Sequence, residues 1–130
     1  MLWFDPFSTF TNYYPLATQL LDPATGTWAE TGRMEQGRAG HTAVLLANGK
    51  VLVVGGWDQN GRDSTNAEIF DLAAGRWTPT SPPNRIHRGA TALLQPDGKV
   101  RIPGGWDGFK PTDDELYDPV TGKWTVITNR

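Results

Sequence analysis

The chain has no cysteine among its 130 residues. Disulfides, thiolate metal sites and cysteine nucleophiles are therefore excluded, and the redox state of the compartment is left open. No apolar run approaches the length of about 18 residues at which a membrane-spanning helix is considered. The amino-terminal stretch MLWFDPFSTF has neither a basic segment nor a long apolar core. We therefore expect no signal peptide, and the chain as written would be cytoplasmic.

An excess of charge of either sign is also missing. The 12 basic residues are nearly balanced by 14 acidic ones, which gives no electrostatic basis for binding nucleic acid or an anionic membrane. Glycine and proline, by contrast, are plentiful, with 15 and 10 residues. This composition is high for a helical protein and ordinary for many short strands joined by turns.

The sequence repeats itself. Trp28, Trp77 and Trp124 lie 49 and 47 residues apart, and their surroundings recur as DPATGTW, DLAAGRW and DPVTGKW. The tetrapeptide GGWD occurs at Gly55–Asp58 and again at Gly104–Asp107. A self-repeat near 50 residues indicates stacked copies of one supersecondary unit, and this size and punctuation are typical of a propeller blade.

The middle copy predicts four antiparallel strands. Asn48-Gly49 is a strong hairpin signal, with both turn residues expected at positive φ. Gly55-Gly56 ends the second strand, and a polar loop follows it. The expected strands are Gly40–Ala47, Lys50–Val54, Asn66–Asp71 and Arg76–Thr80.

The other two copies follow the same plan. In the last copy the hairpin turn is Asp97-Gly98, strands three and four are Asp114–Asp118 and Lys123–Ile127, and the loop after GGWD is two residues shorter. The first copy lacks its first strand. MLWF takes the second-strand position, and Thr18–Asp22 and Thr27–Glu30 follow. We expect eleven strands in one domain, 1–130, divided into a partial blade 1–33 and full blades 34–82 and 83–130.

These motifs resemble kelch repeats. The family pattern has a basic residue and small residues before strand one. A hairpin follows, then an apolar strand that ends in Gly-Gly, an aromatic-Asp pair and a Trp. Here it reads Arg38…GHTAVLL…KVLVVGG…AEIFD…GRW, and again GATALL…KVRIPGG…DELYDPVTGKW. The resemblance covers about residues 15–128, and the DPxTGxW form is similar to bacterial kelch proteins and galactose-oxidase-like propellers. It implies an all-β, partial β-propeller of four-stranded blades, each with its first strand at the axis.

Two and three-quarter blades are fewer than a closed ring needs, since propellers close with about four to eight. An open stack leaves two apolar sheet faces bare, and such faces usually mean association. A homodimer forming a six-bladed ring would cover both, and two-fold symmetry is the commonest in oligomers. The alternative is a piece excised from a longer propeller.

The last copy departs from the pattern at Arg101 and Pro103, which take the positions of Leu52 and Val54 on one face of the second strand. A bare Arg is unsuited to a dry contact between blades. This face is therefore wet, paired to a carboxylate or part of a different interface, or else Arg101 snorkels near the rim or the channel.

The loops after the Gly pairs and the segments before strand one would form the ligand face that the resemblance implies. Aromatic rings beside Arg and Asp suit peptide hot spots or stacking on sugars. The competing interpretation is that each loop Trp folds over the neighbouring blade to cap its loop. Trp28, Trp77 and Trp124 are expected to pack between blades. The candidate ligand-binding residues are Trp57, Asp58, Arg62, Trp106, Asp107, Lys110, Arg38, Arg85, His87 and Arg88.

Catalysis and cofactors are not expected. The acidic residues of the loop that begins at Asp58 do not have the spacing of an EF-hand, because Gly61 is the fourth residue of that loop and not the sixth. No nucleophile triad, phosphate loop or HExxH motif occurs. The copper-radical cofactor of galactose-oxidase-like enzymes needs a cysteine crosslinked to a tyrosine, so it cannot form in this chain. The sequence favours a non-catalytic binding or scaffold module for a protein or glycan that also self-associates. The alternatives are part of a galactose-oxidase-like enzyme whose catalytic residues lie outside this chain, and a pure self-assembly unit, natural or engineered.

Overall fold

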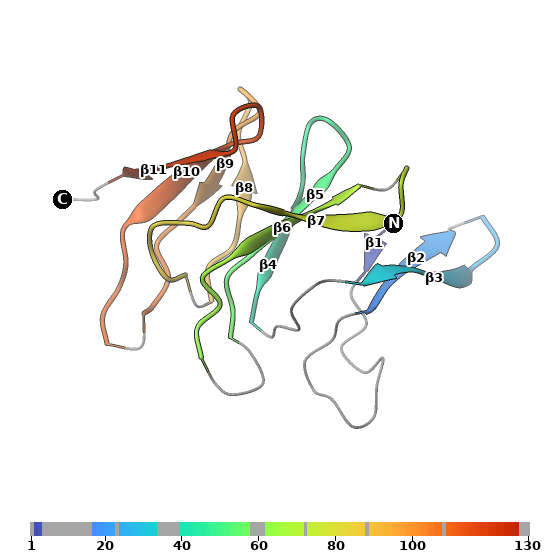
Figure 1. Ribbon diagram of the computed structural model, residues 1–130, viewed down its shortest axis with the longest axis horizontal. Helices are drawn as coiled ribbons and strands as arrows, with labels where there is room; N and C mark the ends of the chain where they lie inside the picture. Colours follow the sequence, from blue (N-terminus) through green and yellow to red (C-terminus); the bar gives the residue numbers. More distant parts are fainter. Residues whose placement is uncertain are drawn as a thin grey trace.

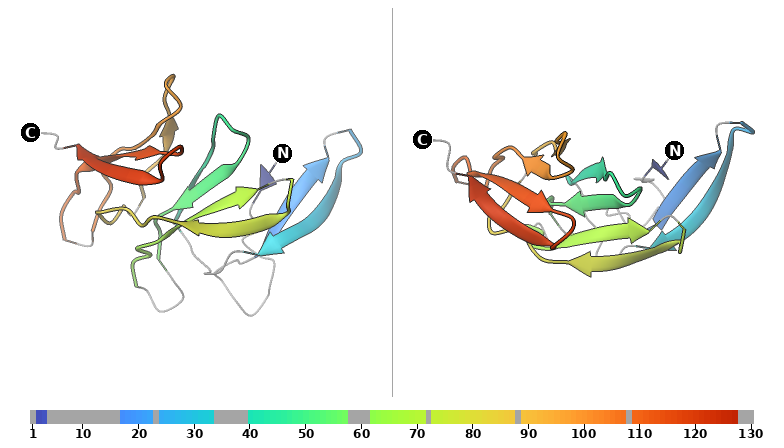
Figure 2. Two further views of the ribbon diagram at one scale, coloured as in Figure 1. Left: turned by 45° about the horizontal axis from the view of Figure 1, so that its top comes forward. Right: turned by 90° about the horizontal axis from the view of Figure 1, so that it is seen from above.

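The computed structural model describes residues 2–3, 17–22, 24–33, 40–57, 62–71, 73–87, 89–107 and 109–127. They form three antiparallel sheets and, within these ranges, no helix. The sheets follow one another along the chain and stand side by side in an arc (Figures 1 and 2). No helix that could cross a membrane occurs among the described residues. The all-β prediction is confirmed, as is the division into sheets of three, four and four strands.

The middle sheet has the order β4-β5-β6-β7. Its hairpin differs from the prediction, because only Gly49 has a positive φ, at 86°, and Asn48 does not. Gly49 N donates to Leu46 O, and Leu46 N donates to Lys50 O, which is the pattern of a type I turn followed by a left-handed glycine. The strands are β4 (Thr42–Leu45), β5 (Val51–Val54), β6 (Ala67–Asp71) and β7 (Arg76–Thr80).

The last sheet has the order β11-β10-β9-β8, and the first has β1-β2-β3. The fourth strand of the first copy is longer than predicted, since it runs on to Arg33. The first strand of the last copy has only two residues. The strands are β1 (Leu2–Trp3), β2 (Ala17–Asp22), β3 (Thr27–Arg33), β8 (Leu93–Leu94), β9 (Val100–Ile102), β10 (Asp114–Asp118) and β11 (Lys123–Ile127).

The core lies between sheets, because both faces of the middle sheet are covered. Strand β5 is buried along its whole length, as expected for an uninterrupted apolar run rather than an alternating one. One face of the middle sheet contributes to a cluster with the last sheet: Leu46, Leu52, Val54, Ala67, Val100, Ile102 and Tyr117. The other face carries a second cluster: Val51, Val53, Phe70 and Trp77.

Polar contacts fix the seam between the middle and last sheets. The hydroxyls of Thr80 and Tyr117 lie 2.6 Å apart, and Trp124 Nε1 donates to Ser81 O at 2.7 Å. Near the inner strands, Ala92 N donates to Thr42 Oγ1 at 2.8 Å. These bonds satisfy polar atoms beside an apolar contact and so set how one sheet sits on the next.

The repeated tryptophans are not equally covered. Trp77 is 6% exposed, whereas Trp28 in the first sheet is 46% exposed. Trp124 is partly buried and packs against the shared cluster, with its ring 4.7 Å from that of Tyr117. The interpretation of these rings as packing residues therefore fits Trp77 and Trp124 best.

Arg101 lies on the face of the last sheet that points away from the middle one, because it alternates with the buried Val100 and Ile102. Its Nε and Nη2 atoms donate to Asp114 Oδ2 at 2.9 and 2.6 Å. Of the alternatives left open by the sequence, the structure has the one in which Arg101 pairs with a carboxylate.

Removing a side chain from the seam tests this core. We expect Leu52→Ala to lower the free energy of unfolding by about 3 kcal/mol, because Leu52 is fully buried and its loss leaves a cavity. Val120→Ala, at a 93% exposed position, should change it by less than about 0.5 kcal/mol. Urea unfolding followed by tryptophan fluorescence measures both. Equal effects would contradict the assigned core.

Candidate functional site

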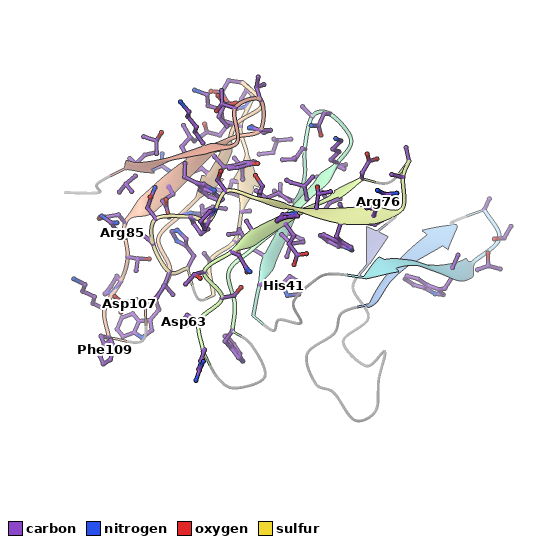
Figure 3. All side chains as sticks on the ribbon, in the orientation of Figure 1. His41, Asp63, Arg76, Arg85, Asp107 and Phe109 are labelled. Atoms are coloured by element: carbon purple, nitrogen blue, oxygen red, sulfur yellow. The ribbon has the colours of Figure 1, made fainter. Side chains whose placement is uncertain are left out.

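The two ends of the blades carry different connections between strands. The hairpin tips, including residues 46–50 and 95–99, gather at one end, and the β5–β6 and β9–β10 loops reach the other, which we call the loop end (Figure 1). Figure 3 shows Asp63, Asp107 and Phe109 along this lower edge, with Arg85 above them on the connection from β7 to β8. The loops named by the sequence therefore share one end of the molecule.

The β9–β10 loop is a tight turn built on Asp107. Its Oδ1 accepts hydrogen bonds from Phe109 N and Lys110 N at 2.8 and 2.9 Å. These backbone donors, Lys110 first, hold the pKa of Asp107 below its ordinary value. Trp106 forms a bridge with Pro111 across the base of the turn. The turn leaves Trp106 46% and Phe109 90% exposed.

Beside this turn lies a shallow polar recess of about 390 Å³. Arg85 Nε lies 3.8 Å from Asp113 Oδ2 within it. The guanidinium also donates to Asn84 O. Both signs of charge thus meet next to two exposed aromatic rings. The recess is lined by Arg85, Asp107, Lys110, Pro111, Thr112 and Asp113.

A buried hydrogen-bond network supports the recess from below. Glu115 is completely buried and accepts bonds from Asn84 N, Asn84 Nδ2 and Arg85 N at 2.8, 3.1 and 2.9 Å. Its Oε2 lies 2.6 Å from His87 Nε2, and His87 Nδ1 contacts Gly104 O. Thr112 Oγ1 lies 2.9 Å from Ile86 O and 3.0 Å from Gly104 O.

This network corrects the sequence-based placement of His87. We expected His87 on the ligand face, but its side chain is fully buried with both ring nitrogens engaged. Its place in the interior follows from the buried carboxylate of Glu115, which needs donors to stay charged. His87 therefore acts on the recess only by holding its walls.

The two loop tryptophans are placed differently. A Cβ added to Gly40 would overlap the Trp57 ring at 2.2 Å, so that ring lies directly on the Gly40 backbone. Gly89 is the residue at the matching repeat position, and a Cβ there would meet nothing within 4 Å. Trp57 thus covers a glycine of its own blade rather than folding over the neighbouring one, and Trp106 does not cover the equivalent glycine.

The remaining candidates divide between surface and unassigned positions. Arg62, Arg85 and Lys110 are exposed at the loop end. Asp58, Arg38 and Arg88 lie outside the described residues. Sequence reasoning missed Glu115, although its recurrence with Glu68 in AEIFD and DELYD was a usable signal.

The described residues do not fit a metal site. Among them, no three side chains of His, Cys, Asp or Glu come together in a way that could hold an ion. His87, one of two histidines in the chain, has both nitrogens in hydrogen bonds. No chemistry through copper or another metal is derived from them.

Comparison with known proteins agrees with the repeat pattern. Residues 38–84 match the family model of the Kelch motif. The chain has a kelch-type β-propeller fold. A solved fungal alcohol oxidase of the AA5 family, in complex with copper, resembles it with a TM-score of 0.65 and 23% identity over 84% of this chain. At that identity the likeness concerns the fold. The chain spans only 23% of that oxidase, and no curated protein matches it.

The buried carboxylate of Glu115 predicts an acid-sensitive stability. Burial disfavours the charged form of Glu115, but hydrogen bonds from His87, Asn84 and Arg85 outweigh it and lower its pKa from 4.5. The stabilisation is therefore present above the ordinary pKa and is lost as the pH falls through the lowered value.

We expect Glu115→Gln to cost about 3 kcal/mol at neutral pH, because a buried pair loses one charge, and to flatten the acid limb of stability. Urea unfolding at about pH 7 and about pH 3 measures both effects. Asp97→Asn, in an exposed hairpin turn, is the control. A steep acid limb retained in Glu115→Gln would contradict the assignment.

Proposed function

We propose that this chain is a non-catalytic kelch-repeat binding module that presents the loop end of its last blade to a protein or glycan ligand. One observation carries the proposal: the exposed Trp106 and Phe109 are chain neighbours of Asp107 and Lys110, which line a recess that contains both an arginine and carboxylates. Exposed apolar side chains that gather next to polar groups are a mark of interaction sites.

The chemistry of the recess suits such ligands. Aromatic anchors surrounded by polar groups dominate protein interfaces, and a flat ring next to hydrogen-bonding side chains also suits the apolar face of a sugar. Asp113 and Arg85 provide an acceptor and a donor within 3.8 Å of each other. Asp107 holds the turn, so the rings are placed before a ligand arrives.

The last blade is favoured over the middle one. The Trp57 ring lies on Gly40 and would have to leave that contact to stack on a ligand. The backbone at Gly89 is open, and Trp106 is half exposed. We therefore assign first contact to Trp106 and Phe109, with Arg62 and Trp57 at the margin.

Self-association is the second part of the proposal. Trp28 is 46% exposed where its repeat equivalent, Trp77, is 6% exposed. The outer face of the last sheet carries Leu93 and Leu116 on either side of Arg101. A second copy that seats its first sheet on this face would cover Trp28 and bring it near a guanidinium, which favours cation–π contact. Two copies would complete a six-bladed ring.

The likeness to the alcohol oxidase favours a rival: this chain would be the propeller portion of a larger enzyme whose catalytic residues lie outside it. A longer reading frame with a cysteine and further repeats would support that rival. A pure assembly unit is the third possibility, and ligand binding separates it from the first.

Substitution of the exposed rings tests binding. Screening the chain against glycan and peptide arrays supplies a ligand, and we expect Trp106→Ala with Phe109→Ala to weaken it by tenfold or more, or about 1.4 kcal/mol, since hot-spot rings contribute at least this much. Val120→Ala, which removes an apolar side chain about as exposed as Phe109 from the β10–β11 turn, is the control. Unchanged affinity in the double variant, or no ligand on either array, would overturn the proposal.

Sedimentation equilibrium tests the ring. We expect the mass of a dimer for the native chain and a shift toward monomer for Trp28→Ala, because the exposed ring provides apolar area at the contact. Val120→Ala should sediment like the native chain. A folded native monomer at every concentration would refute the dimer and leave the ligand proposal standing.

A further inference from the structure

We propose that the buried His87–Glu115 pair is a proton-dependent lock that holds both walls of the recess in place while the histidine ring carries two protons. The proposal takes the recess as the binding face and adds a means of regulating it. It concerns a buried titratable pair that contributes no atom to the ligand surface.

The geometry fixes the protons. His87 Nδ1 faces the carbonyl oxygen of Gly104, which can only accept, so Nδ1 donates. Glu115 already accepts from two backbone N–H groups and one amide, and a carboxylate held by so many donors is ionised. His87 Nε2, 2.6 Å from Glu115 Oε2, therefore donates too. A ring that donates from both nitrogens is an imidazolium.

Loss of one proton breaks this arrangement. One ring nitrogen would then direct its lone pair at an oxygen, in a place where both side chains are fully buried. An unpaired buried polar atom is costly, and either the Gly104 contact or the Glu115 contact must open. A rise in pH favours loss of that proton, so the lock weakens as the pH rises.

Both walls of the recess depend on this pair. Glu115 holds the backbone of Asn84 and Arg85, and Arg85 lines one wall. Gly104 O contacts both His87 and Thr112, and Thr112 lines the other wall. Opening either contact frees a segment that carries a recess residue.

Other groups around His87 leave the pair dominant. Strand β10 offers Glu115, and the β9–β10 loop offers the Gly104 carbonyl and, through it, the Thr112 hydroxyl. Just after β5, the backbone of Gly55 lies against the His87 carbonyl. On its own segment Arg85 pairs with Asp113 instead, and Arg88 lies outside the described residues.

The preceding copy of the repeat has an arginine in its sequence at the position of His87. Arg38 occupies the position of His87 in the preceding copy, and the buried Glu68 occupies that of Glu115. Arginine stays protonated in proteins. The substitution His87→Arg thus places at this position a side chain that stays protonated, and it removes the proton dependence.

The test is nitrogen NMR of the histidine ring together with amide hydrogen exchange between about pH 6 and about pH 8.5. We expect both His87 nitrogens protonated at the lower pH. Exchange at Asn84, Arg85 and Thr112, corrected for the intrinsic rate, should rise about tenfold toward the higher pH, as expected when a buried hydrogen bond opens. His41→Gln removes the other histidine and should leave this response intact.

His87→Arg should give slow exchange that no longer varies with pH, and His87→Gln, with one donor group, should give fast exchange throughout. A singly protonated ring at the lower pH, or equal exchange at both pH values in the native chain, would overturn the proposal. Should His87→Arg fail to fold, the native ring spectrum still decides. These readouts need no ligand, so their failure leaves the binding proposal untouched.

Discussion

The packing of one sheet face on the next is the contact on which the rest of this chain depends. Leu52 and Val54 of the middle sheet meet Val100, Ile102 and Tyr117 of the last. Neither sheet could bury these side chains alone, because a single sheet leaves both of its faces in water. The repeat in the sequence exists to supply matched faces. Burial of β5 on both sides is the clearest mark of this constraint.

The candidate site follows from that packing. Stacked sheets bring their β5–β6 and β9–β10 loops to one end, where the loops form a surface that no single blade provides. The last blade then differs from the middle one in two respects. Its tryptophan does not cover the inner glycine. Its buried glutamate is paired with a histidine, at a position where the sequence of the other copy has an arginine. Small departures within a repeat thus give the last blade a loop end unlike that of the middle blade.

Much of the fold was predictable from the sequence. The repeat spacing and glycine turns placed β5, β6, β7, β10 and β11 almost residue by residue, since period-two patterns and turn residues act locally. The prediction of a positive φ for Asn48 was wrong, because the Asn-Gly dipeptide also fits a type I turn followed by a left-handed glycine.

The site was less accessible, because it depends on contacts between residues far apart in the chain. Nothing local to His87 indicated that Glu115, 28 residues later, would draw it inside. The different placement of Trp57 and Trp106 likewise depends on loop paths, which two identical GGWD motifs do not encode.

Native-state hydrogen exchange in low denaturant tests the central claim most directly. If the shared core joins the sheets, amides of β5, β6, β9 and β10 should open with one common free energy. Exchange of β9 and β10 at a clearly lower free energy than β5 and β6, with a separate denaturant dependence, would contradict it.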